Sequence, residues 1–149
     1  MDTITVGIDD SDGARRALRW ALDLAADTGA TVEAVRVFPR TFSWIDRDLS
    51  ADELERSRAS AQRAARRELD LVVDDVVGEQ SDAKVSPLVL LGDPATTLVE
   101  QAAHHDLLVL GSRGRGGLAS LLLGSVSRRC VESSRCPVAV VPAGDAESR

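Results

Sequence analysis

Residues 106–125 read DLLVLGSRGRGGLASLLLGS, and they give the clearest indication of the fold class. Its first five residues are almost entirely apolar, as expected of a central strand that is buried on both faces of a parallel sheet. Glycines and small hydroxyl residues follow over residues 111–123, and a final helix is expected to begin near Gly124-Ser125. A strand that turns through such a loop into a helix is typical of doubly wound α/β proteins.

The remainder of the chain alternates in the same way between short apolar runs and segments with helical periodicity. Further strands are predicted at residues 3–8, Thr31–Phe38, Val85–Leu91 and 137–141. Helices are predicted from residue 11 to Gly29, from the capping box at residues 50–53 to Gly78, and from Asp93-Pro94 onward. The long second helix is expected to turn six apolar residues inward: Leu54, Ala61, Ala65, Leu69, Val72 and Val76.

This βαβαβαβαβ order predicts an α/β fold in which one doubly wound, five-stranded parallel sheet has helices on both faces. Because crossovers are right-handed, the expected strand order is 3-2-1-4-5. Pro87 cannot donate a ladder hydrogen bond, which places the third strand at an edge. Residues 1–149 are expected to form a single domain with a short tail at 143–149. Ligands bind such sheets where the winding reverses, here beyond the first and fourth strands, at Asp9 and Gly111.

Composition limits the classes of partner. The chain has 149 residues, 44% hydrophobic and 28% charged, with a net charge of -6. It lacks a membrane-length apolar run and a recognisable secretory signal, so we expect a cytoplasmic protein that does not bind membranes. The acidic balance disfavours nucleic acid as a partner. Residues 111–136 nevertheless contain five arginines against one glutamate, which favours a small anionic ligand.

Other reactive residues have simpler interpretations. Cys130 and Cys136 lack the spacing of a metal site, and Cys136 is interpreted as a small apolar residue at a strand entry. His104 and His105 are expected to cap the end of the third helix, at the opposite end of the sheet from Gly111. We therefore predict neither a metal site nor catalytic residues.

The loop that begins at Gly111 is expected to cradle an anion. Glycines allow close approach of the backbone, and the free N–H groups of a helix's first turn carry partial positive charge. Ser125 and Ser127 add hydroxyl groups, and Arg113 is a candidate for ligand contact, although loop arginines are commonly solvated. A Walker A motif is excluded because the chain has no GK[ST] sequence. Asp9 and Asp10 could alternatively solvate a turn and cap the first helix.

The spacing Gly111-x2-Gly114-x9-Gly124-Ser125 resembles the nucleotide signature of the universal stress protein family. Three further segments resemble other parts of that family: VGIDDS at residues 6–11, GDPA at residues 92–95 and CPVAVV at residues 136–141. The resemblance covers nearly the whole chain, and its segments occur in the family's order.

The resemblance implies a member of the ATP-binding branch, with ATP as the ligand, ADP or AMP as alternatives, and Mg²⁺ as an optional companion of the nucleotide. By that resemblance Asp9 would hold the ribose, Gly7 and Ile8 would border the nucleoside, and Val37 and Leu110 would lie at the adenine. The residues implied at the phosphates are Gly111, Gly114, Gly124, Ser125, Val126 and Ser127. Family members usually form homodimers through the last strand, here Val138, Ala139, Val140 and Val141.

The function that this implies is that of a nucleotide-dependent stress-response or regulatory module. Two alternatives remain open at this point. One is a slow ATPase or another nucleotide-dependent enzyme, although no general base or metal ligand can be assigned. The other is a dimeric interaction protein with a vestigial nucleotide site. Phe42 and Trp44, in the loop after the second strand, are expected to shield the nucleotide, to contact a second subunit or to pack locally.

Overall fold

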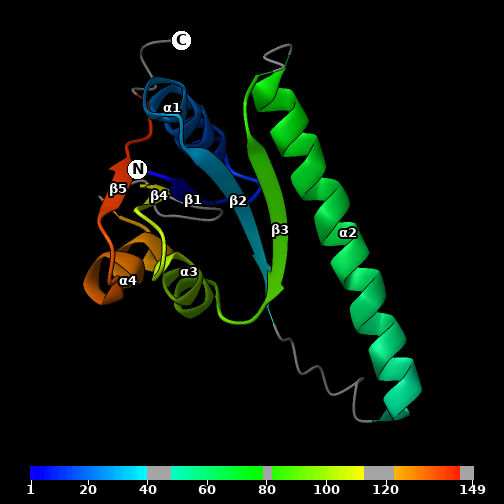
Figure 1. Cartoon of the computed structure of the whole chain (residues 1–149). Helices are drawn as coiled ribbons and strands as arrows, with labels where there is room; N and C mark the ends of the chain where they lie inside the picture. The colour runs from blue at the N-terminus through cyan, green and yellow to red at the C-terminus, as the bar shows by residue number, and fades with distance from the viewer. Residues whose placement is uncertain (40–47, 79–81, 113–122, 145–149) are drawn as a thin grey trace.

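The computed structural model describes residues 1–39, 48–78, 82–112 and 123–144. The described residues form five strands and four helices, which Figure 1 labels and colours along the chain. They are β1 (Thr3–Gly7), α1 (Asp12–Thr28), β2 (Thr31–Phe38), α2 (Ala51–Val77), β3 (Val85–Leu91), α3 (Pro94–Ala102), β4 (Leu107–Gly111), α4 (Ser125–Ser133) and β5 (Val138–Val141).

All strand pairs are parallel, and the order β3-β2-β1-β4-β5 confirms the predicted topology. Pro87 lies on the edge strand β3, opposite Ala34 of β2. The winding reverses between β1 and β4, where Ile4 pairs with Leu107. The carboxyl ends of these two strands therefore form the edge at which a ligand site was predicted.

Local signals in the sequence explain where three helices begin. The Ser11 hydroxyl caps α1 by accepting a hydrogen bond from the Ala14 N–H, at 3.1 Å. Ser50 and Glu53 form the predicted capping box of α2, and the Asp93 carboxylate caps α3. Gly29 ends α1 at a φ of 78°, a left-handed conformation that glycine adopts without steric cost.

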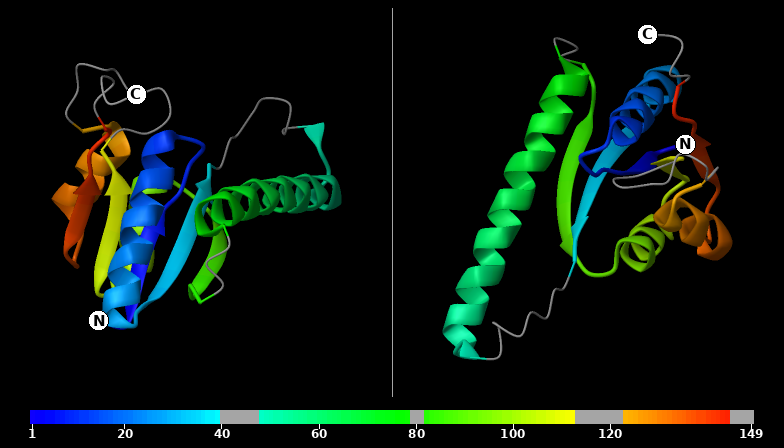
Figure 2. Two further views of the ribbon diagram at one scale, coloured as in Figure 1. Left: turned by 90° about the horizontal axis from the view of Figure 1, so that it is seen from above. Right: turned by 180° about the vertical axis from the view of Figure 1, so that it is seen from behind.

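The sheet separates two apolar cores, and Figures 1 and 2 show it between one pair of helices and the other. On one face α1 and α2 cover Ile4, Val6 and Val32. On the opposite face α3 and α4 cover Val35 and Leu108. Because side chains alternate along a strand, β1 contributes Ile4 and Val6 to the first core and turns Thr5 and Gly7 toward the second.

The structure corrects the prediction for α2. Ala65, Leu69 and Val72 are buried as expected, Val73 joins them, and the half-buried Val76 packs against the same core, but Ala61 is exposed and Leu54 is only half-buried. A helix of 27 residues is about 40 Å long, whereas the seven residues of β3 extend about 23 Å. The first half of α2 therefore continues past the carboxyl end of β3, as Figure 1 shows.

Among the described residues, no helix is both long enough and apolar enough to cross a lipid bilayer.

Candidate functional site

The chain that leaves β1 forms a tight polar turn at the carboxyl edge of the sheet. The Ile8 N–H donates to the Val35 carbonyl at 2.8 Å, which holds the start of the turn against β2. The Asp9 carboxylate then accepts hydrogen bonds from the N–H of Ser11, at 2.9 Å, and from its hydroxyl. The first helix is capped by Ser11, so the predicted capping by Asp9 or Asp10 is wrong, whereas Asp9 does hydrogen-bond within the turn.

Two glycines near this turn are closely packed against other parts of the protein. A Cβ on Gly111 would lie 2.8 Å from the backbone carbonyl carbon of Gly13, so the end of β4 lies directly against the start of α1. A Cβ on Gly7 would lie 2.7 Å from Leu110 and 3.0 Å from Leu98. Glycines here were predicted to allow ligand approach, and the contact with Gly13 was not predicted because it joins residues distant in sequence.

The first turn of α4 lies beside the same edge. Its N-cap, Gly124, has no side chain, whereas side chains cap the other three helices that the structure describes. The Gly124 N–H donates to the Ser112 carbonyl at 2.7 Å, and the buried Ser127 hydroxyl donates to the Gly111 carbonyl at 2.6 Å. These bonds fix the positively polarised end of α4 to the end of β4.

The other residues predicted for the site are placed as follows. Val37 lies half-buried near the end of β2, and Leu110 is buried in β4; both belong to the α3/α4 core. Ser125 is exposed and Val126 is half-buried in the first turn of α4. Arg113 and Gly114 lie outside the described residues, as do Phe42 and Trp44 and most of the predicted tail. The edge thus brings together contributions from β1, β2, β4 and α4.

An ion-pair network on the α2 side of the turn was not predicted. The Arg36 side chain is 14% exposed; its guanidinium lies 2.8 Å from Asp10 Oδ1 and 2.7 Å from Glu68 Oε2. Burial acts to lower the pKa of Arg36, but the hydrogen bond from Arg36 to Asp10 and the charges of Asp10 and Glu68 outweigh it and raise the pKa. The one signal in the sequence was the charge of Arg36 between the apolar residues Val35 and Val37 of β2.

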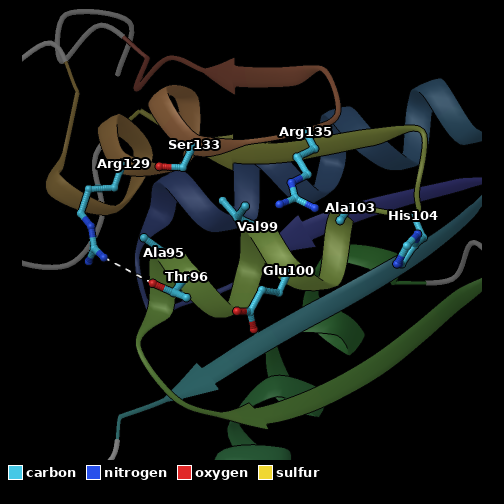
Figure 3. Close-up of a pocket in the computed structure, with 9 residues that line it drawn as sticks. All are labelled: Ala95, Thr96, Val99, Glu100, Ala103, His104, Arg129, Ser133 and Arg135. Atoms are coloured by element: carbon cyan, nitrogen blue, oxygen red, sulfur yellow. Dashed lines mark hydrogen bonds between the residues drawn. The ribbon is translucent and has the colours of Figure 1, made fainter.

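A separate groove of about 640 Å³ lies between α3 and α4 (Figure 3). Arg129 reaches across it from α4 to Thr96, at 3.4 Å, and to the Asp93 carboxylate, at 3.0 Å. The hydrogen bond from Arg129, followed by those from Thr96, lowers the pKa of Asp93 from 3.8 to about 2. The groove's lining includes none of the described residues predicted to contact nucleotide.

The two histidines lie at the amino end of the sheet, as expected. His105, however, does not cap the third helix with its side chain as predicted. Its Nδ1 lies 2.7 Å from the hydroxyl of the fully buried Thr5 and 3.9 Å from Glu33. The described residues hold no group of three or more His, Cys, Asp or Glu side chains that could bind a metal ion.

The strand order defines a doubly wound α/β protein in which the winding reverses between β1 and β4. The family model described as "Universal stress protein family" matches residues 1–142. The chain belongs to the universal stress protein family.

Curated relatives support the same assignment. A universal stress protein of Mycobacterium tuberculosis is 34% identical over 148 residues, which cover 92% of this chain and 44% of the relative. The chain therefore spans less than half the length of that relative. A universal stress protein of Methanocaldococcus jannaschii is 30% identical over 148 residues, covering 93% of this chain and 80% of the relative.

Solved structures show the same architecture. The hypothetical protein MJ0577 matches with a TM-score of 0.78 at 22% identity, covering 97% of this chain and 98% of its own. A universal stress protein solved in complex with cAMP matches with a TM-score of 0.63 at 26% identity, covering 94% and 96%. A family protein of Arabidopsis thaliana with AMP bound shares the fold at 16% identity, with a TM-score of 0.61, covering 100% and 96%.

Proposed function

We propose that this chain binds an adenine nucleotide between β1 and β4 and acts as a nucleotide-dependent regulatory module in a stress response. The observation that carries the proposal is the first turn of α4, which no side chain caps and which hydrogen bonds fix beside Gly111. Such a helix terminus suits a phosphate group. The related universal stress protein that was solved with cAMP supports the choice of an adenine nucleotide.

The proposed ligand is ATP, with ADP and AMP as alternatives and Mg²⁺ as a possible companion of the phosphates. The half-buried Asp9 carboxylate would accept hydrogen bonds from the ribose, between Gly7 and Ile8 on one side and Val37 on the other. Leu110 would lie near the base. Phosphate contacts are proposed for Gly111, Arg113, Gly114, Gly124, Ser125, Val126 and Ser127. Because the Ser127 hydroxyl proton bonds to Gly111, Ser127 would contribute its backbone N–H.

The proposal includes a homodimer formed through β5. This strand lies at one edge of the sheet, and the described strand beside it is β4. All four residues of β5 are half-buried. Edge strands present unpaired backbone groups to which a second strand can add.

Calorimetric titration with ATP, ADP, AMP and cAMP, with and without Mg²⁺, tests the proposed ligand. Asp9→Asn keeps an oxygen that can accept from Ser11 but removes the negative charge facing the ribose. We expect it to weaken ATP binding roughly 10- to 150-fold, the usual value of a hydrogen bond to a charged group. Asp23→Asn, at an exposed position in the middle of α1, is the matched control and should bind like the wild type. A wild type that binds none of the four nucleotides would refute the proposal.

A further inference from the structure

Two arginines connect the turn after β1 to α2. Arg36 bridges Asp10, in the turn, to Glu68 on α2, at 2.8 Å and 2.7 Å respectively. Arg15 lies 3.4 Å from the Asp10 carbonyl through one nitrogen and 3.2 Å from Asp75 of α2 through another. The turn therefore does not depend on β1 and α1 alone for its position.

The position of Arg36 follows from the alternation of β2. Val32 and Ala34 point into the core beneath α1 and α2, and Arg36 is the next residue on that face. Its aliphatic stem is covered there, while its guanidinium emerges at the carboxyl end of the strand, where two carboxylates meet it. The planar fork of arginine can pair with both carboxylates at once, which the single ammonium of lysine does less well.

A shift of this turn would reach the proposed ligand site by two direct routes. Asp10 is the neighbour of Asp9, whose carboxylate is oriented by Ser11 within the same turn. The turn also leads into Gly13, whose backbone lies against Gly111 at the end of β4. Both the ribose side and the phosphate side of the proposed site are thus connected to the position that Arg36 fixes.

We propose that Arg36 is a positioning residue for nucleotide binding: by joining Asp10 to Glu68, it couples the position of the Asp9 carboxylate to the position of α2. This inference rests on the proposed function and adds a second element, α2, to the control of the site. It requires that loss of Arg36 affects recognition of the ribose hydroxyls more than recognition of the rest of the ligand.

The test compares dissociation constants for ATP and for 2′,3′-dideoxy-ATP, which lacks the hydroxyl groups that Asp9 would hold. For Arg36→Gln we expect about tenfold weaker ATP binding and a dideoxy-ATP affinity within about threefold of wild type, so that discrimination between the ligands falls. Arg36→Lys retains the charge without the fork and should give an intermediate result. Glu68→Gln keeps the Arg36–Asp10 pair and should weaken ATP binding about threefold.

Arg66→Gln is the matched control. Arg66 pairs with Asp70 at 2.9 Å, four residues along the exposed face of α2, and does not contact the turn. We expect its discrimination between the two ligands to equal that of the wild type. The melting temperature of each variant is measured alongside, and Arg36→Lys and Glu68→Gln carry the test if Arg36→Gln does not fold.

Equal loss of affinity for both ligands in the Arg36 variants would overturn the inference and leave Arg36 a purely structural residue. So would unchanged affinity for ATP. Either result, obtained with a wild type that binds ATP, leaves the proposed function intact. A wild type that binds neither ligand would overturn the proposed function, and this inference with it.

Discussion

Single contacts across the sheet edge determine how closely the turn after β1 approaches β4. Sequence reasoning placed Asp9 and Gly111 at one edge because the carboxyl ends of parallel strands lie together. It could not predict that Gly111 packs against Gly13, or that Arg36 joins Asp10 to Glu68. Those contacts depend on how the strands, the turn and α2 settle against one another, and no local pattern in the chain encodes such distances.

The contribution of Asp93 to the stability of the fold should depend on pH. Its pKa of about 2 in the folded protein lies below the value of about 3.9 in an unfolded chain. Ionised Asp93 therefore stabilises the fold above about pH 4, and this contribution is lost as the pH falls toward 2. Asn caps helices as well as Asp does, so Asp93→Asn isolates the charge. In urea titrations, the stability difference between wild type and Asp93→Asn should shrink between pH 4 and pH 2; a constant difference would contradict the assignment.

The two cysteines should differ in reactivity. Burial raises the pKa of Cys130 to about 11, although the nearby charge of Arg129 opposes this shift, and the side chain is inaccessible. Cys136 is only half-buried. Because the thiolate is the reactive form, we expect a disulfide reagent at pH 8 to modify Cys136 rapidly and Cys130 only after unfolding. Native Cys136→Ser should therefore be nearly inert, and rapid reaction of that variant would show that Cys130 is accessible.

The helix α2 is longer than the strands that it covers. Capping signals predicted both ends of this helix well, whereas its apolar periodicity overestimated the buried face. Periodicity reports that one side of a helix is less polar than the other, but not how far the sheet extends beneath it. Ala61 accordingly has the right phase for burial and is exposed.

Substitutions in the two halves of α2 should affect stability differently. Ser50→Ala removes the capping box, which is worth about 1 kcal/mol, but the turns that it anchors lie beyond the core. We expect faster hydrogen exchange at residues 51–58 with little change in the global melting temperature. Leu69→Ala removes a fully buried side chain and should lower the free energy of unfolding by about 2–5 kcal/mol. A large global loss from Ser50→Ala would mean that α2 unfolds as one cooperative unit.

For the molecule as a whole, the βαβ alternation was enough to predict the complete sheet order, because right-handed crossovers leave few alternatives.

Substitutions at the two edges of this sheet should have different effects on assembly. We expect the 15.9 kDa chain to sediment as a dimer, and Val140→Lys in β5 to yield monomers by placing charges along the paired edge. Ser86→Lys, at an exposed position of the opposite edge strand β3, is the control and should remain dimeric. A wild-type monomer at high concentration would contradict the proposed assembly.

Nucleotide binding at the β1–β4 edge can be tested by mass spectrometry of the small molecules released from denatured, freshly purified protein. Gly114→Ala, purified in parallel, is the blank, because a methyl group on Gly114 would obstruct close approach of the backbone to phosphate. We predict near-stoichiometric adenine nucleotide from the wild type and none from the variant. An empty wild type whose melting temperature also stays unchanged in millimolar ATP would contradict the claim, because a ligand that binds the folded state must stabilise it.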